Sequence, residues 1–61
     1  MIERVLLKKF RGDRSQKEMA KRYRVTQQTW CNWEIGKASP RPKHMQQIAR
    51  DSGYSIQDLF F

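Results

Sequence analysis

Residues 15–37 read SQKEMAKRYRVTQQTWCNWEIGK and contain two helix-start signals in close succession. Ser15 and Glu18 form a capping box: the hydroxyl accepts a hydrogen bond from the backbone N–H three residues on, and the carboxylate reaches back. Thr26 is a second N-cap, followed by a segment from Gln27 to about Glu34 with helical character. The stretch therefore predicts two short helices joined by a tight turn.

The apolar residues of this stretch recur at helical spacing. Met19, Ala20 and Tyr23 form the inward face of the first helix, and Trp30 and Trp33 share one face of the second. Aromatic side chains can also stack on the bases of single-stranded nucleic acids. Their shared helical face favours core positions for both tryptophans.

Further helices are expected on both sides of this pair. An apolar stripe of Ile2, Val5, Leu6 and Phe10 precedes it and stops at Gly12. After a basic loop over residues 37–42, a fourth helix starts at Pro42 and closes at Gly53, and Ser55 caps a last short helix. The buried stripes of these two helices are Met45, Ile48 and Ala49, then Ile56, Leu59 and Phe60. No segment alternates with a two-residue period, so we expect an all-α fold of five short helices in one domain, residues 1–61.

Charge indicates the class of partner. The chain of 61 residues carries thirteen Lys and Arg against six Asp and Glu, a net charge of +7. Residues 1–43 hold twelve basic and four acidic side chains (+8), whereas residues 44–61 hold one basic and two acidic (−1). Such a surplus favours a polyanion through Coulomb attraction and counterion release.

Several other classes of site and location are not expected. Cys31 and His44 are the single cysteine and histidine, too few for a disulfide or a structural zinc site, and no other cofactor is indicated. Absence of disulfides favours a reducing cytoplasm, and no apolar run approaches a membrane span. No nucleophile–base set, paired inward carboxylates or phosphate-binding glycine loop is present, so we do not expect an enzyme.

Two helices joined by a tight turn, the second starting with polar side chains, are typical of a helix-turn-helix, here about residues 15–35. In such a motif the second helix lies in the major groove of duplex DNA. Gln27 and Gln28 lead this helix, and a primary amide can pair with the N6 and N7 edge of adenine. Asn32 and Cys31 follow on later turns, and we assign all four to base reading.

The sequence resembles the Cro/CI-type (Xre-like) helix-turn-helix regulators, which include repressors of lambdoid phages. The resemblance runs from about Phe10 to Phe60 and implies a compact five-helix fold like that of the lambda repressor. The residues that carry it are Ser15-Gln16-Lys17-Glu18-Met19-Ala20, Val25-Thr26-Gln27-Gln28-Thr29-Trp30, Trp33-Glu34-Ile35-Gly36-Lys37, Pro40, Ile48-Ala49, Gly53 and Leu59-Phe60.

The resemblance also implies roles for particular residues. Gln16 is similar to a phosphate-contacting glutamine, Thr26 to a cap near the DNA backbone, and Lys37 lies in a loop that touches phosphates. Arg11 and Glu34 resemble a partly buried ion pair, with Lys9 as the substitute for Arg11. Together with neighbouring polar and basic residues, the candidate phosphate contacts are Ser15, Gln16, Lys17, Thr26, Lys37, Arg41 and Lys43, with Arg14 beside them.

The chain departs from the family pattern in places. Arg24 stands where the family prefers glycine in the turn, and a positive φ is uncommon for other residues. The loop between Arg11 and Gln16 is shorter than the common form. Ser52 replaces a large aliphatic residue, so thinner packing is expected there.

Three functions compete. The first is a transcriptional regulator, a repressor that binds a palindromic operator in double-stranded DNA as a homodimer, with Ile56, Gln57 and Phe61 at the dimer interface. The second is an antitoxin-like or other protein-interaction subunit, whose motif serves autoregulation while its apolar C-terminus binds a partner protein. The third, an RNA-binding module, is disfavoured because aromatic platforms and a sheet are missing.

Overall fold

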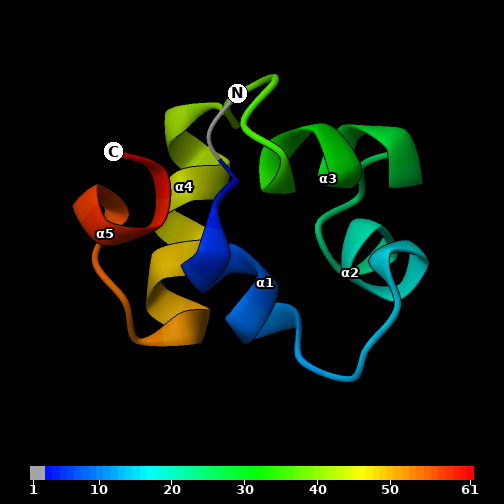
Figure 1. The fold of residues 1–61 in the computed structure, drawn as a ribbon, viewed down its shortest axis with the longest axis horizontal. Helices are drawn as coiled ribbons and strands as arrows, with labels where there is room; N and C mark the ends of the chain where they lie inside the picture. Colours follow the sequence, from blue (N-terminus) through cyan, green and yellow to red (C-terminus); the bar gives the residue numbers. More distant parts are fainter. Residues whose placement is uncertain (1–2) are drawn as a thin grey trace.

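The computed structural model describes residues 3–61, and these residues form five helices. They are α1 (Val5–Arg11), α2 (Gln16–Arg22), α3 (Gln27–Glu34), α4 (Pro42–Ser52) and α5 (Ile56–Phe60). No strand occurs in this part of the chain, so the expected all-α fold of five short helices is confirmed. Figure 1 shows α2 and α3 on one side of α1, and α4 and α5 on the other.

Local capping sets most helix boundaries where the sequence predicts them. The hydroxyls of Ser15, Thr26 and Ser55 each accept a hydrogen bond from the backbone N–H three residues on, at 3.0, 3.1 and 3.0 Å. Pro42 opens α4, and Gly53 ends it in the left-handed conformation with φ 81°. The return bond of the capping box is not formed within residues 3–61, where the Glu18 side chain is exposed.

The core lies between the helix pairs and contains both tryptophans. Trp30 is fully buried and Trp33 is 4% exposed, which confirms their core positions. The Tyr23 ring stacks on the Trp30 ring with 5.7 Å between centroids and planes 7° apart. Their neighbours in the buried cluster are Leu7, Met19, Ala20, Ile48, Leu59 and Phe60.

The apolar stripe expected on α1 needs correction. Val5 is 59% exposed, whereas Leu7, outside that stripe, is fully buried. Leu6 and Phe10 flank Leu7 and are partly buried against the core. The buried face centres on Leu7 because α1 packs against both α5 and α3. Ile2, the other member of the stripe, lies outside the described residues.

Two departures from the family pattern have visible local solutions. Arg24 does adopt a positive φ of 59° in the turn between α2 and α3, and the turn is closed by Val25 N–H donating to the Ala20 carbonyl at 2.9 Å. Ser52 is partly buried, and its hydroxyl accepts from Tyr54 N–H at 3.1 Å while donating to the Ala49 carbonyl at 3.3 Å. A polar cap at the end of α4 thus stands where aliphatic packing is usual.

Candidate nucleic-acid interface

The first turn of α3 presents two exposed glutamines. Gln27 and Gln28 follow the capping residue Thr26, whose hydroxyl also bonds to that of Thr29 at 2.7 Å. The amide of Gln28 donates from Nε2 to Oδ1 of Asn32 at 2.9 Å, across one turn of the helix. This contact orients the Gln28 amide, and the carbonyl oxygen of that amide takes no part in it.

The later turns of α3 complete the same surface. Cys31 and Asn32 are partly buried, and Cys31 is a free thiol. Residues four apart on a helix are neighbours, so Cys31 lies behind Gln27 as Asn32 lies behind Gln28. The four side chains assigned to base reading therefore occupy adjacent rows of one helix.

A buried carboxylate fixes α3 relative to the helices behind it. Glu34 is fully buried and accepts from Arg11 Nε at 2.6 Å, Arg11 Nη2 at 3.2 Å and Gln16 Nε2 at 3.1 Å. The indole N–H of Trp30 donates to it as well. Burial alone would raise the pKa of Glu34, but these hydrogen bonds outweigh it and lower that pKa, so the carboxylate stays charged.

This cluster ties three helices together. Arg11 ends α1, Gln16 begins α2, and Glu34 ends α3. Gln16, assigned to a phosphate contact, is partly buried and has its amide nitrogen engaged with Glu34. Lys9, the substitute for Arg11, is exposed instead.

The remaining candidate contacts differ in exposure. Arg14 is partly buried: its guanidinium donates to the carbonyls of Phe10 and Arg11 at the end of α1, and lies 5.1 Å from the centre of the Phe10 ring. The Arg14 side chain is thus bonded to the backbone at the C-terminal end of α1, where the helix dipole also favours a cation. The assigned phosphate contacts with exposed side chains are Ser15, Lys17, Thr26, Lys37, Arg41 and Lys43.

Arg4 is a residue that sequence reasoning missed. Its Nη1 donates to the carbonyls of Trp33 at 2.9 Å and Ala38 at 2.7 Å, and Nη2 donates to the Ser39 hydroxyl at 2.8 Å. Its backbone N–H donates to the Glu34 carbonyl at 2.7 Å. Most acceptors are backbone carbonyls, which every residue type carries, so no sequence pattern signals the contact.

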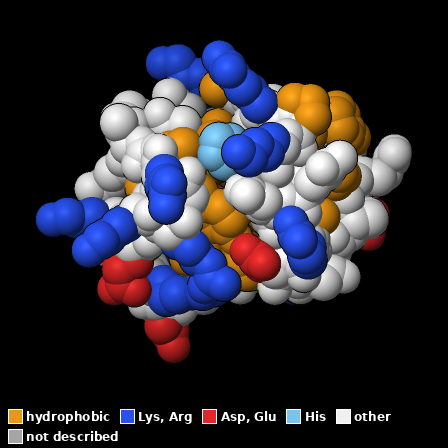
Figure 2. Space-filling model, turned by 180° about the vertical axis from the view of Figure 1, so that it is seen from behind, with side chains coloured by type: hydrophobic (Ala, Val, Ile, Leu, Met, Phe, Trp, Pro, Cys, Tyr) orange, Lys and Arg blue, Asp and Glu red, His pale blue; other side chains and the backbone are white. Residues whose placement is uncertain are grey.

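A basic hollow of about 470 Å³ lies between α2 and α4. His44 Nε2 lies 3.2 Å from the Tyr23 carbonyl, and its ring lies 5.5 Å from that of Trp33. Figure 2 shows Lys and Arg side chains on several sides of the histidine. The residues that line the hollow are Arg22, Tyr23, Arg24, Lys43, His44 and Gln47.

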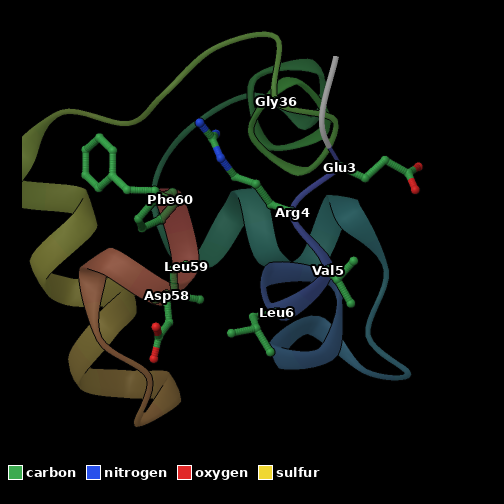
Figure 3. A pocket seen from close by; sticks show the side chains of 9 residues that line it. Glu3, Arg4, Val5, Leu6, Gly36, Asp58, Leu59 and Phe60 are labelled. Carbon is green, nitrogen blue, oxygen red and sulfur yellow. The ribbon is translucent and has the colours of Figure 1, made fainter.

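An apolar groove of about 580 Å³ lies between the start of α1 and the end of α5 (Figure 3). It is lined by Glu3, Arg4, Val5, Leu6, Gly36, Asp58, Leu59, Phe60 and Phe61. Val5 at 59% and Phe61 at 83% are the exposed large hydrophobic side chains of the described chain. Of the residues assigned to a dimer interface, Phe61 lines the groove, whereas Ile56 is partly buried against the core and Gln57 is exposed.

Comparison with protein families gives a match between residues 7–59 and the model of a helix-turn-helix family. Comparison with curated proteins and with solved structures gives no match. Within residues 3–61, no helix has the length and apolar character needed to cross a membrane. In the same residues, no three His, Cys, Asp or Glu side chains cluster as metal ligands would.

Proposed function

Since the chain belongs to the Cro/CI-type (Xre-like) helix-turn-helix family, whose members bind DNA, we propose that it is a transcriptional repressor of a palindromic operator. Residues 1–61 act as one DNA-binding domain with the motif at about residues 15–35. We place its action in the cytoplasm and assign it no catalytic role.

The single observation that carries this proposal is the exposure of two glutamines in the first turn of α3. Gln27 and Gln28 are exposed there, and the Gln28 amide is oriented by Asn32. An oriented amide offers a donor and an acceptor in one plane, which is what the major-groove edge of adenine requires. We therefore assign base reading to Gln27, Gln28, Asn32 and Cys31.

Electrostatics supports the binding side of the proposal. The net charge of +7 and the exposed Lys17, Lys37, Arg41 and Lys43 suit contacts to phosphates. Each neutralised phosphate contributes about −0.9 to the slope of log affinity against log salt concentration. Ser15, Gln16 and Thr26 complete this set through hydrogen bonds.

One selection experiment tests the function. Duplexes that bind the protein are enriched from a random pool, and the affinity for the enriched sequence is compared with that for random DNA across salt concentrations. We expect an approximately palindromic consensus, with half-sites about one helical turn apart, and a steep loss of affinity with salt. Lack of enrichment, or a flat salt dependence, contradicts the proposal.

The palindrome follows from the limited reach of one α3 helix. A single recognition helix reads only a few base pairs, so two copies related by a two-fold axis are needed for useful specificity. We place the contact between them at Phe61, with Ile56 and Gln57 beside it.

A second candidate function rests on the exposed groove. An antitoxin-like subunit would bind its partner protein with the exposed Val5 and Phe61, and its helix-turn-helix would autoregulate. Purification from the native host separates the two functions, because a stoichiometric partner protein supports the antitoxin and its absence supports the repressor.

A further inference from the structure

We propose that Arg4 positions the DNA-contacting loop between α3 and α4, residues 35–41, although it makes no DNA contact itself. This inference rests on the proposed function and extends it to a residue outside the family match, which begins at residue 7. Arg4 precedes α1, and the residues that accept hydrogen bonds from its side chain lie 29 to 35 positions further along the chain.

The geometry is that of a three-point attachment. Nη1 bridges the carbonyls of Trp33, inside α3, and Ala38, inside the loop, while Nη2 bonds to Ser39. One planar group thereby fixes the end of the recognition helix and the loop that follows at a set spacing. Figure 3 shows the Arg4 side chain extending from the N-terminal segment beside Phe60.

The guanidinium itself is held in place. It lies 5.3 Å from the centre of the Phe60 ring, within the range of a cation–π contact, and Phe60 is only 6% exposed. The Arg4 backbone N–H donates to the Glu34 carbonyl. A cation at the carbonyl end of α3 is also favoured by the helix dipole.

Backbone hydrogen bonds also attach the start of the loop to α3. Ile35 N–H donates to the Cys31 carbonyl at 3.0 Å, Gly36 N–H donates to the Trp33 carbonyl at 3.4 Å, and the N–H groups of Lys37 and Ala38 donate to the Asn32 carbonyl at 3.0 and 3.3 Å. The side chain of Lys37 is exposed next to Ala38, whose carbonyl Arg4 holds. Arg4 adds the bonds to the Ala38 carbonyl and the Ser39 hydroxyl, so a change at Arg4 frees the loop next to Lys37 to shift relative to α3 and weakens its phosphate contacts.

The test uses Arg4→Lys, which keeps the charge but cannot hold three acceptors in one plane. We expect about tenfold weaker operator binding. The slope of log affinity against log salt concentration should become less negative by about 0.9, although the net charge is unchanged. Affinities are measured at a temperature where circular dichroism shows each variant folded. Lys9→Gln, which removes a charge from the exposed surface of α1, is the control and should leave the salt slope unchanged.

A double-mutant cycle with Lys37→Ala separates positioning from an independent effect. If Arg4 acts through the loop, Lys37→Ala weakens binding less in the Arg4→Lys background than in the wild type. Ser39→Ala, which removes one acceptor at an exposed site, should show the same coupling with about threefold weaker binding. It provides the result if Arg4→Lys does not fold.

Arg4→Gln, which removes the charge, is measured beside Arg4→Lys. Three outcomes overturn the inference: wild-type affinity in Arg4→Lys, losses that multiply independently with Lys37→Ala, or a salt slope that Arg4→Gln lowers in magnitude and Arg4→Lys does not. The last would mean that Arg4 contacts a phosphate itself. Failure of the proposed function is distinct, because the wild type then shows no sequence preference in the selection experiment.

Discussion

The guanidinium of Arg11 forms two hydrogen bonds with the carboxylate of Glu34, from Nε to Oε2 at 2.6 Å and from Nη2 to Oε1 at 3.2 Å. The Glu34 side chain is fully buried and that of Arg11 is 25% exposed. Because Gln16 and Trp30 donate to the same carboxylate, this pair is the centre of a polar cluster within the core. The pair thereby links the end of α1 to the end of α3.

Truncation of Arg11 should therefore destabilise the fold severely. Arg11→Ala leaves a buried carboxylate without its cation, and breaking a buried pair typically costs about 3–5 kcal/mol. Urea unfolding followed by circular dichroism measures the change. Lys9→Ala, on the same helix but exposed, is the matched control and should change stability by less than about 0.5 kcal/mol. Equal midpoints for the two variants would show that the pair contributes nothing.

The same carboxylate makes stability sensitive to acid. The pKa of Glu34 is lowered in the folded state: burial raises it, but hydrogen bonds from Arg11, Gln16 and Trp30 prevail. A lowered pKa means that the stabilisation is present above the unfolded value of about 4.5 and is lost as the pH falls toward the folded value. Denaturant midpoints measured from neutral pH downward should fall more steeply in the wild type than in Glu34→Gln. Parallel curves would contradict the assignment.

Base reading predicts a local loss of specificity. Gln28→Ala removes an exposed amide from the first turn of α3, so operator affinity should fall by about 1–3 kcal/mol and the preference at one base pair should relax. Titration against operators substituted at each position measures this. Gln46→Ala, exposed on α4, is the control and should bind as the wild type does. An equal loss on operator and random DNA would exclude base reading by Gln28.

The turn before α3 offers a stabilising change. Arg24 holds φ at 59°, a conformation that is unfavourable by roughly 1–2 kcal/mol for a residue with a side chain. Arg24→Gly should therefore raise the free energy of unfolding by up to about 1 kcal/mol, since part of the relief is offset by the greater freedom of unfolded glycine. Lys21→Gly, an exposed site inside α2, should lower it by about 1 kcal/mol. A loss of stability in Arg24→Gly would mean that the Arg24 side chain contributes contacts that outweigh the backbone.

How far the sequence predicts the molecule depends on how local each signal is. The caps at Ser15, Thr26 and Ser55 involve only the next three residues, and each stands where the pattern places it. The face that α1 buries is set instead by contacts with α5 and α3. The spacing of apolar residues within a helix of seven residues does not predict these contacts. Leu7 rather than Val5 is buried for that reason.

The candidate site likewise contains residues with a local sequence signal and residues without one. The glutamines of α3 could be singled out because residue type and register together point to base edges. Arg4 could not, because its partners are mainly backbone carbonyls far along the chain. The hollow beside His44 likewise gathers side chains from the end of α2, the turn after it and α4, which share no sequence motif.

The exposed C-terminal aromatic gives the last prediction. Phe61 is 83% exposed while its neighbours Leu59 and Phe60 are buried, and it lies at a groove that also exposes Val5. This apolar pair offers a small contact to a second copy, too small for a stable dimer without DNA. Phe61→Ser should therefore weaken binding to a full palindrome but not to an isolated half-site, because only the palindrome brings two copies together. Both affinities are measured by titration at the same salt concentration. That concentration is not low, because at low salt the phosphate contacts dominate binding to both duplexes. Equal affinities of wild type and variant on both duplexes would exclude Phe61 from the interface, and equal losses on both would show an effect on the fold.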